Sequence, residues 1–246
     1  MKLPAIQGNI VDLSHKYSSN TIYWPTEEGF RLEKEFDGMT EKGYYYAANK
    51  FSTPEHGGTH IDAPIHFAKQ GQTIDQVSLE RLLGGATVVD VSKKILKNRD
   101  YQISVQDLTD WESSYGKIAD STIVLLHTGY GRFWPDRLKY IGTSTMGEQA
   151  LDELHFPGLH PDATKWLIEN RNINAIGIDT QSIDYGQSKL FQTHRLLCEN
   201  NIPFFENIAN LDKLPPTGAY VIALPMKIQG GSGAPLRMIA INPTKA

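Results

Sequence analysis

Two hydrophobic patterns alternate along the chain and predict strands interleaved with helices. Apolar and polar residues alternate with a period of two over residues 9–15 and 30–36, which is typical of strands. Residues 44–53 are rich in the aromatic side chains that strands favour. Continuous apolar runs predict buried strands at 86–92, 121–131, 173–180 and 202–208, and two strands around a glycine-rich turn within 219–241.

Three helices are predicted between these strands. Residues 104–116 place apolar side chains on one face, and Ser104 stands where its hydroxyl can cap the first turn. Residues 160–172 begin near Pro161, whose fixed φ suits the first helical position. Residues 188–201 form the third helix.

The interleaving of strands and helices predicts an α/β protein. Neither a repeat nor a linker rich in Pro, Gly or Ser divides the sequence, so we expect one domain over residues 1–246. Strands dominate both ends of the chain. This distribution favours a mixed sheet or a barrel-like core with helices outside it.

Composition narrows the possible partners. The formal net charge is −4, without the basic excess that binding to nucleic acid or a membrane surface requires. No apolar run approaches the ~18 residues of a transmembrane helix, and the first residues lack the apolar centre of a signal peptide. Cys198 is the only cysteine, so no internal disulfide can form, and its apolar neighbours indicate an inert, packed thiol. We therefore expect a cytoplasmic protein.

The most unusual stretch is STPEHGGTHIDAPIHF at residues 52–67. It holds three of the eight histidines of the chain, His56, His60 and His66, together with Asp62. Glycine and proline make a helix unfavourable here, so we expect an extended segment. Side chains alternate between the two faces of such a segment, and all four ionisable residues occupy even positions. They are therefore predicted to share one face.

The other positions of this stretch support the same arrangement. Ile61, Ala63, Ile65 and Phe67 are apolar and are predicted to face the core. Gly58 has no side chain and would leave a gap on the polar face. Three imidazoles and a carboxylate crowded together need a shared partner, and a divalent cation is the simplest one.

At this point the sequence resembles a known family. HGGTHIDAPIHF (56–67) matches the H-x-G-T-H-x-D-x-P-x-H signature of the metal-dependent cyclase family, which includes bacterial kynurenine formamidases and isatin hydrolases. The blocks IGIDTQSID, FFENIANLDKLP and VIALPMKIQGGSGAPLR resemble later parts of the family, so the likeness covers nearly the whole chain. The stretch WPTEEGF looks closer to isatin hydrolases. The resemblance implies a swivelling β/β/α fold and hydrolysis of an amide C–N bond.

The resemblance also implies roles for individual residues. His56, His60 and Asp62 would bind one metal ion, either Mn²⁺ or Zn²⁺. In kynurenine formamidases of the family a second ion shares the aspartate and adds a histidine and a glutamate, which by motif position are His194 and Glu206 here. Isatin-type members resemble a one-ion arrangement, so we expect one or two ions per chain.

His66 occupies the position of the family's proton-transfer residue. A neutral imidazole can take a proton from a metal-activated water and pass it to the leaving nitrogen. Trp24 is a candidate for stacking on an aryl substrate. Arg237 could hold a carboxylate or pair with an acid, and the sequence leaves this open. Structural or surface roles are expected for the other histidines, although the last two lie in a loop that could line a pocket: His15, His127, His155 and His160.

Three functions are compatible with these residues. The first is hydrolysis of an amide C–N bond in a small aryl substrate of tryptophan catabolism, either the ring of isatin or the formyl group of N-formylkynurenine. The second is a non-haem Fe(II) oxygenase, since two histidines and a carboxylate also form its ligand set. The third is a non-catalytic metal or ligand binder, against which His66 argues because binding alone needs no proton-transfer group. The family resemblance implies a homo-oligomer, a dimer or larger.

Overall fold

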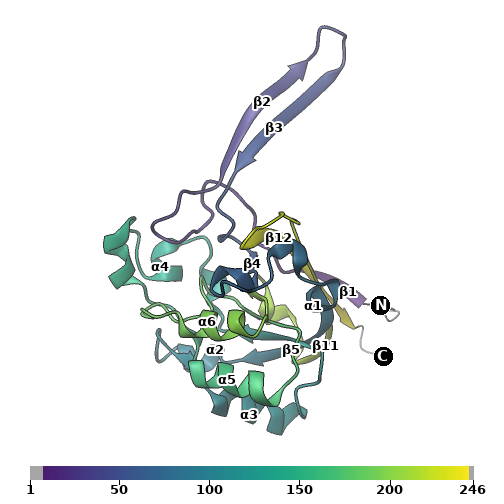
Figure 1. Cartoon of the computed structure of the whole chain (residues 1–246). Coiled ribbons are helices and arrows are strands. Elements are labelled where there is room, and N and C mark those ends of the chain that lie inside the picture. Colours follow the sequence, from purple (N-terminus) through teal and green to yellow (C-terminus); the bar gives the residue numbers. More distant parts are fainter. Residues whose placement is uncertain (1–7, 244–246) are drawn as a thin grey trace.

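The computed structural model describes residues 8–243 of the chain (Figure 1). Its strands are β1 (Gly8–Asp12), β2 (Arg31–Met39), β3 (Tyr45–Ser52), β4 (His60–Asp62), β5 (Leu83–Asp90), β6 (Gln102–Ile103), β7 (Ile123–His127), β8 (Gly158–Leu159), β9 (Ala175–Ile178), β10 (Phe204–Glu206), β11 (Thr217–Pro225) and β12 (Gly233–Pro243). Its α-helices are α1 (Leu79–Leu82), α2 (Ser92–Ile95), α3 (Val105–Tyr115), α4 (Arg137–Ile141), α5 (Pro161–Asn170) and α6 (Gln192–Glu199). Its 3-10 helices are η1 (Pro64–His66), η2 (Ile74–Gln76), η3 (Tyr130–Phe133), η4 (Glu148–Glu153) and η5 (Leu211–Lys213).

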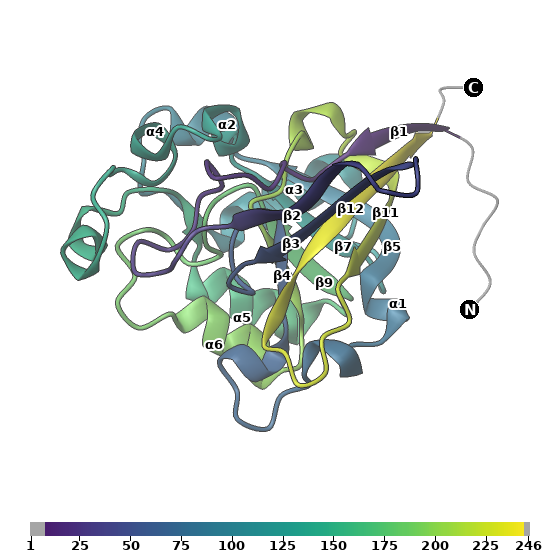
Figure 2. The same cartoon turned by 90° about the horizontal axis from the view of Figure 1, so that it is seen from above.

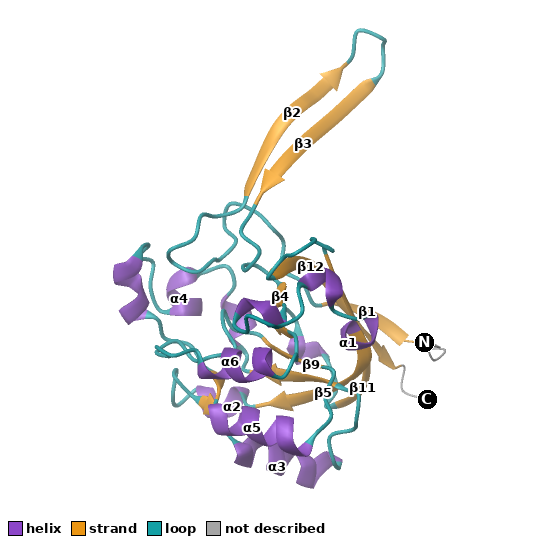
Figure 3. Ribbon diagram, in the orientation of Figure 1, coloured by secondary structure: helices purple, strands orange, loops and turns teal. Residues whose placement is uncertain are grey.

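The largest sheet closes on itself. Its strand order is β1-β12-β11-β5-β7-β9-β10-β4, and β4 also pairs with β12, so seven strands form a barrel and β1 lies outside on β12. The neighbours β5, β7, β9 and β10 run parallel, whereas β11 and β12 pair antiparallel. Helices α3, α5 and α6 connect the parallel strands and lie outside the barrel (Figure 3). The predicted mixed α/β domain with a barrel-like core and outer helices is confirmed.

Both faces of the central strands are apolar because one face lines the barrel and the other lies under the helices. Along β7, Leu125 belongs to the cluster inside the barrel, while Val124 and Leu126 belong to the cluster under the helices. In β10, Phe205 likewise belongs to the cluster inside the barrel and Phe204 to the cluster under the helices. Successive side chains of a strand face opposite ways, so a continuous apolar run is what a strand covered on both faces requires.

The three predicted helices are present. The Ser104 side chain accepts a hydrogen bond from the Asp107 amide at the start of α3, and Pro161 is the first residue of α5. Helix α6 begins at Gln192, later than predicted, because Phe191 before it has a left-handed backbone with φ of 46°. The sequence does not predict α1, α2 and α4, since helices of four or five residues are too short to show a helical period. No helix within residues 8–243 is both long and apolar enough to cross a membrane.

Strands β2 and β3 form a separate two-stranded ribbon, here called the arm (residues 31–52). Figure 1 shows the arm projecting from the body, and Figure 2 looks down on it from above. Nearly every residue of both strands is exposed. The sequence predicts both strands, but it does not predict that they pair with each other outside the barrel.

Strand β4, one of two three-residue strands of the barrel, positions two residues of the histidine-rich motif. Strand β4 pairs antiparallel with residues 204–206 of β10 and with residues 233–235 of β12. Its central residue, Ile61, packs into the barrel core. His60 and Asp62 flank Ile61 and therefore lie together on the other face of the strand.

Candidate metal centre

The residues of the histidine-rich motif reach one cavity along a bent path. Only His60–Asp62 is a strand, and Pro64–His66 is a 3-10 helix. The expectation of one continuous extended segment is therefore wrong. After Asp62 the chain turns, with Pro64 at the first position of the 3-10 helix, where its fixed φ is tolerated. This turn brings His66 back towards the Asp62 carboxylate.

The predicted division into a polar and an apolar face holds only in part. Ile61 is completely buried in the barrel core, but Phe67 lines the cavity that the histidines also line. Gly58 leaves no gap, since its φ is +58° and a Cβ there would lie 2.7 Å from the Tyr17 ring. Its carbonyl oxygen accepts a hydrogen bond from His60 Nδ1 at 2.9 Å. That bond leaves His60 Nε2 free to face the site.

Asp62 lies at the centre of the site. Its Oδ1 is 2.8 Å from His56 Nδ1 and 3.1 Å from His60 Nε2. Its Oδ2 is 3.7 Å from His66 Nε2 and 3.6 Å from His194 Nε2. Two groups of possible metal ligands share this carboxylate: His56, Asp62 and His66 in one, and His60, Asp62 and Glu206 in the other. The family resemblance implies that His56, His60 and Asp62 bind one ion together. The geometry instead places His56 and His60 in separate groups.

His194 and Glu206 reach the same site from α6 and β10. His194 Nε2 lies 3.5 Å from one oxygen of Glu206, and His60 Nε2 lies 3.5 Å from the other. Asp184 orients the His194 ring, because its carboxylate accepts hydrogen bonds from His194 Nδ1 at 2.7 Å and from the His194 backbone amide at 3.0 Å. A carboxylate behind a histidine fixes the tautomer that leaves Nε2 free for a metal. An acid ten residues before a histidine gives no periodic signal, so the sequence does not single out Asp184.

Burial and crowding shift the pKa values of these groups in opposite directions. Burial alone would raise the pKa of Asp62, but the neighbouring His56 lowers it well below its usual range. Burial and the charge of Asp62 raise the pKa of Glu206 well above its usual range, although the Ile183 amide donates to it. Burial lowers the pKa of His66 to about 4. The site therefore favours one carboxylate charge, and a second needs a cation nearby.

The donor set fits a divalent transition metal. Imidazole nitrogens and carboxylate oxygens are the ligands that Zn²⁺ and Mn²⁺ accept. Two atoms that bind one ion at about 2.1 Å lie at most about 4.2 Å apart. The nitrogen–oxygen distances of 3.1, 3.5, 3.5 and 3.6 Å made by His60 and His194 with the two carboxylates fall within that limit. Two buried acids side by side also require the positive charge that an ion supplies.

The cavity around these groups has a volume of about 340 Å³ and an aromatic wall. Trp24, Phe67 and Phe191 line it, and the Phe191 ring lies 6.0 Å from Trp24 and 5.5 Å from Phe67. Trp24 is therefore placed where a stacking residue is expected, while the sequence does not single out the two phenylalanines. Flat rings beside a polar cluster favour a planar ligand with polar groups at one edge.

One polar side chain in this cavity lacks a partner. Gln181 is only 4% exposed, and its Oε1 makes no hydrogen bond within the described part of the chain. Leaving a buried polar atom unpaired costs about 1–3 kcal/mol. The amide is therefore available to a ligand. Its only signal in the sequence is its place just after the buried strand β9.

Comparison with known proteins identifies the family. The Cyclase family model matches residues 11–185, which is more than half of the chain. The chain belongs to the Cyclase family. The resemblance that the histidine-rich motif carries is therefore confirmed.

Relatives of known name cover almost the whole of this Cyclase family member. Isatin hydrolase from Roseibium aggregatum is 30% identical over 243 residues, which are 95% of this chain and 87% of the relative. Kynurenine formamidase from Bacillus cereus is 27% identical over 239 residues, which are 93% of this chain and 95% of the relative. A crystal structure of an isatin hydrolase bound to the product analogue thioisatinate is 28% identical, with a TM-score of 0.85 over 96% of this chain and 92% of that chain.

The other candidate residues of this Cyclase family member lie outside the metal cavity. Arg237 pairs with Asp12 through two hydrogen bonds, which decides between its two possible roles in favour of an ion pair. Cys198 is buried, and burial raises the pKa of its thiol to about 12, as an inert thiol requires. Each remaining histidine contacts a partner elsewhere: His15 stacks on Trp134, His127 lies beside Asp90, His155 beside Asp100, and His160 accepts from the Asp162 amide at the start of α5.

Proposed function

We propose that this chain hydrolyses the ring amide of isatin to give isatinate. The observation that carries this proposal is a buried cluster of histidines and carboxylates in an aromatic-walled cavity, in a chain 30% identical to an isatin hydrolase. The alternative is hydrolysis of N-formylkynurenine to kynurenine and formate, which the likeness to a kynurenine formamidase supports. Both reactions break an amide C–N bond of a small aryl substrate.

The proposed metal ligands are the convergent side chains of the site: His56, His60, Asp62, His194 and Glu206. Mn²⁺ and Zn²⁺ both suit this set of imidazoles and carboxylates. Likeness to isatin hydrolases favours one tightly held ion, while the two ligand groups that share Asp62 offer room for a second. When bound, the ion would polarise the substrate carbonyl and make water more acidic.

His66 is the proposed proton carrier. Hydrolysis adds water across the amide: the carbonyl carbon gains the hydroxyl group, the C–N bond breaks, and the nitrogen gains a proton. Burial lowers the pKa of His66 to about 4, so the imidazole is neutral near pH 7. Its unprotonated ring nitrogen is the proposed acceptor for a proton from water. Its Nε2 is directed to the site, 3.7 Å from Asp62. From there the proton can pass to the departing nitrogen.

The substrate's ring and its polar edge have separate contacts. The planar ring is proposed to lie against Trp24, Phe67 and Phe191, whose faces exclude water from the reacting bond. The unpaired Oε1 of Gln181 is proposed to accept a hydrogen bond from an N–H group of the substrate, because such a donor would satisfy the buried oxygen. A substrate with an aryl ring fused or joined to an amide meets both requirements.

An absorbance assay tests the proposal. Metal-free protein is loaded with Mn²⁺, Zn²⁺ or Fe(II) and supplied with isatin or N-formylkynurenine, in air and under anaerobic conditions. We expect faster turnover of isatin, with no need for oxygen. Faster turnover of N-formylkynurenine would favour the alternative substrate. Turnover only with Fe(II) and O₂ would reject hydrolysis in favour of an oxygenase, and no turnover with metal bound would favour a binding protein.

The assembly and the location of the protein extend the proposal. A homo-oligomer, of two copies or more, remains the expectation from the family resemblance. A cytoplasmic location likewise stays a prediction from the sequence. Fractionation of cells followed by immunodetection would check the location, and the mass of the purified protein would check the assembly.

A further inference from the structure

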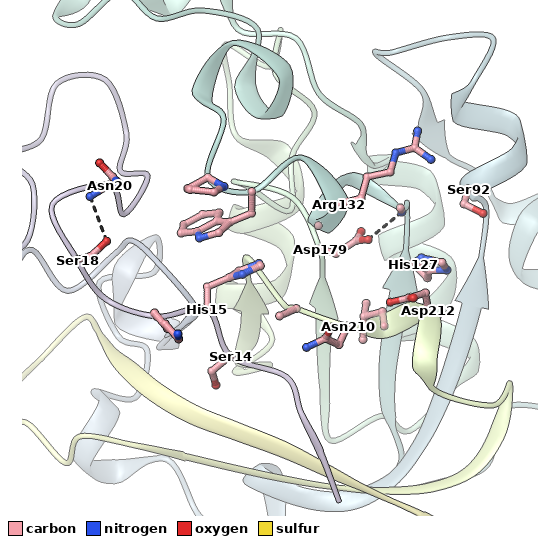
Figure 4. Close-up of a pocket in the computed structure, with 17 residues that line it drawn as sticks. Ser14, His15, Ser18, Asn20, Ser92, His127, Arg132, Asp179, Asn210 and Asp212 are labelled. Atoms are coloured by element: carbon pink, nitrogen blue, oxygen red, sulfur yellow. Dashed lines mark hydrogen bonds between the residues drawn. The ribbon is translucent and has the colours of Figure 1, made fainter.

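The metal cavity holds several acids and, within residues 8–243, neither lysine nor arginine. Four other cavities of the described chain each have a lysine or an arginine in their walls. The largest of the four, of about 780 Å³, shares no lining residue with the metal cavity, and Figure 4 shows Arg132 among its residues. Of these five cavities in the described chain, only the metal cavity lacks such a cation. Its carboxylates are those of Glu27, Glu55, Asp62 and Glu206.

Two of the four carboxylates keep their charge when an ion is bound. Asp62 and Glu206 are proposed ligands, so a divalent ion offsets their charges. Glu55 accepts hydrogen bonds from the Ser232 amide at 2.9 Å and from the Ser232 hydroxyl at 2.6 Å, and both donors are neutral. Within the described residues the Glu27 carboxylate makes neither an ion pair nor a hydrogen bond, and the residue is exposed. The outer part of the cavity therefore carries two uncompensated negative charges.

A tight turn holds Glu27 at the mouth of the cavity. The Glu27 amide donates a hydrogen bond to the Trp24 carbonyl oxygen at 2.9 Å, so the exposed acid follows directly on the aromatic wall. Burial alone would lower the pKa of His56, but the charges of Asp62, Glu55 and Glu27 raise it. The charge of Glu27 thus acts on the inner site, although its carboxylate faces solvent.

The proposed reaction changes the charge of the bound molecule. Isatin is neutral, whereas hydrolysis turns its ring amide into a carboxylate and an amine, so isatinate is an anion. Like charges repel, and repulsion by Glu27 therefore acts on the product but not on the substrate. We propose that Glu27 promotes release of the anionic product and sets the affinity of the cavity for anions. This inference rests on the proposed hydrolysis of isatin and extends it to a residue that neither binds the metal nor carries the proton.

The exposed position of Glu27 limits the size of the effect. A unit charge roughly 6–8 Å from an anion, at an effective dielectric constant of about 40–80, weakens binding of that anion about 2- to 10-fold. Salt screens exposed charges, with a Debye length of about 30 Å at 0.01 M and about 3 Å at 1 M. The effect of Glu27 should therefore be largest in dilute buffer and nearly disappear in concentrated salt.

Titration calorimetry of the Mn²⁺-loaded full-length protein tests the charge effect. Isatinate is the anionic probe, and oxindole is a neutral probe with the same ring system as isatin. In dilute buffer, Glu27→Gln should bind isatinate about 2- to 10-fold more tightly than wild type and should bind oxindole equally well. The matched control is Glu28→Gln, because the Glu28 carboxylate already pairs with Arg31 at 3.0 Å and does not line the cavity. The control should leave both affinities unchanged.

Reversal of the charge extends the series. Glu27→Lys should bind isatinate more tightly than Glu27→Gln does, and the differences from wild type should fade at about 1 M salt. Three results would overturn the proposal: an unchanged isatinate affinity in both variants, an equal gain for oxindole, or a gain that salt does not diminish.

The binding measurements need no turnover, so they separate the role of Glu27 from the proposed chemistry. Hydrolysis of isatin together with isatinate affinities that do not depend on residue 27 would reject the role of Glu27 alone. Charge-dependent binding of isatinate without hydrolysis of isatin would reject the hydrolase, while Glu27 would still govern the binding of anions.

Discussion

Replacing Glu206 by Gln separates the metal-binding role of this carboxylate from a purely structural one. The ligand oxygens of Glu206 and Asp62 lie within 4.8 Å of one another, and both residues are buried. Two negative charges at that separation repel by about 3.5 kcal/mol at an effective dielectric constant of about 20. Protonating Glu206 at pH 7 costs a similar amount, about 1.36 kcal/mol for each pH unit above its unfolded pKa of about 4.3. Without a cation, either choice destabilises the fold.

The metal-free variant should therefore be more stable than metal-free wild type, by about 1–3 kcal/mol after relaxation of the site. A glutamine oxygen can still accept from the Ile183 amide, which lies 2.7 Å from the native carboxylate. Saturating Mn²⁺ should reverse the order, because wild type gains more from the ion. The sign with pH follows from the raised folded pKa of Glu206. The contribution of Glu206 to the free energy of unfolding is fully present below the unfolded pKa of about 4.3 and is lost as pH rises. The Glu206→Gln variant lacks this dependence on pH.

Urea unfolding at fixed protein concentration measures these differences, in EDTA and in Mn²⁺, between pH 5 and pH 8. The matched control is Glu148→Gln, which removes an exposed carboxylate from η4 and should change neither curve. A Glu206→Gln protein that is less stable than wild type in EDTA as well as in Mn²⁺ would refute the reasoning. Glu206 would then be an ordinary buried hydrogen-bond acceptor.

Four further changes test other groups. His66→Ala should lower kcat by about 10²–10⁴-fold while elemental analysis finds normal metal; loss of metal would make His66 a ligand instead. Asp184→Asn should weaken metal binding about 10–100-fold in calorimetry, since no charge then stands behind His194, and unchanged affinity would dismiss that role. Gln181→Leu should raise KM for isatin about tenfold with metal unchanged, and an unaltered KM would leave the amide without a substrate contact. Burial lowers the pKa of His15 to about 4, so the folded protein keeps this imidazole neutral while the unfolded chain protonates it below about pH 6.5. The free energy of unfolding therefore falls in acid, by about 2 kcal/mol at pH 5. Urea unfolding of His15→Phe should lack this acid loss, whereas parallel curves would contradict it.

The clustering of the histidines could be predicted because it is carried by a short motif. His56, His60, Asp62 and His66 lie within eleven residues, so local geometry alone brings them close. The course of the backbone through these residues could not be predicted in the same way. Period-two reasoning assumes an unbroken strand, whereas β4 pairs with β10 and β12 over only three residues each and ends at Asp62, before the 3-10 helix that begins at Pro64.

Groups that act through tertiary contacts leave no pattern in the sequence. Asp184 lies behind His194, and Gln181 faces the cavity, only because β9 takes its place in the barrel and α6 lies outside it. The aromatic wall depends on the left-handed backbone of Phe191, which no pattern of apolar residues encodes. The arm shows the same limit, since local alternation predicts its strands but not which strands they pair with.

The barrel closes at the strand that carries His60 and Asp62. Strand β4 pairs with residues 204–206 and 233–235, more than 140 residues further along the chain. During synthesis these two side chains leave the ribosome long before their partner strands exist, so the site cannot assemble until nearly all of the chain has emerged. Pairings between such distant segments form slowly. An ion held between β4 and β10 would join two strands that leave the ribosome more than 140 residues apart, so we expect metal supply to affect how quickly newly made chains become resistant to proteolysis.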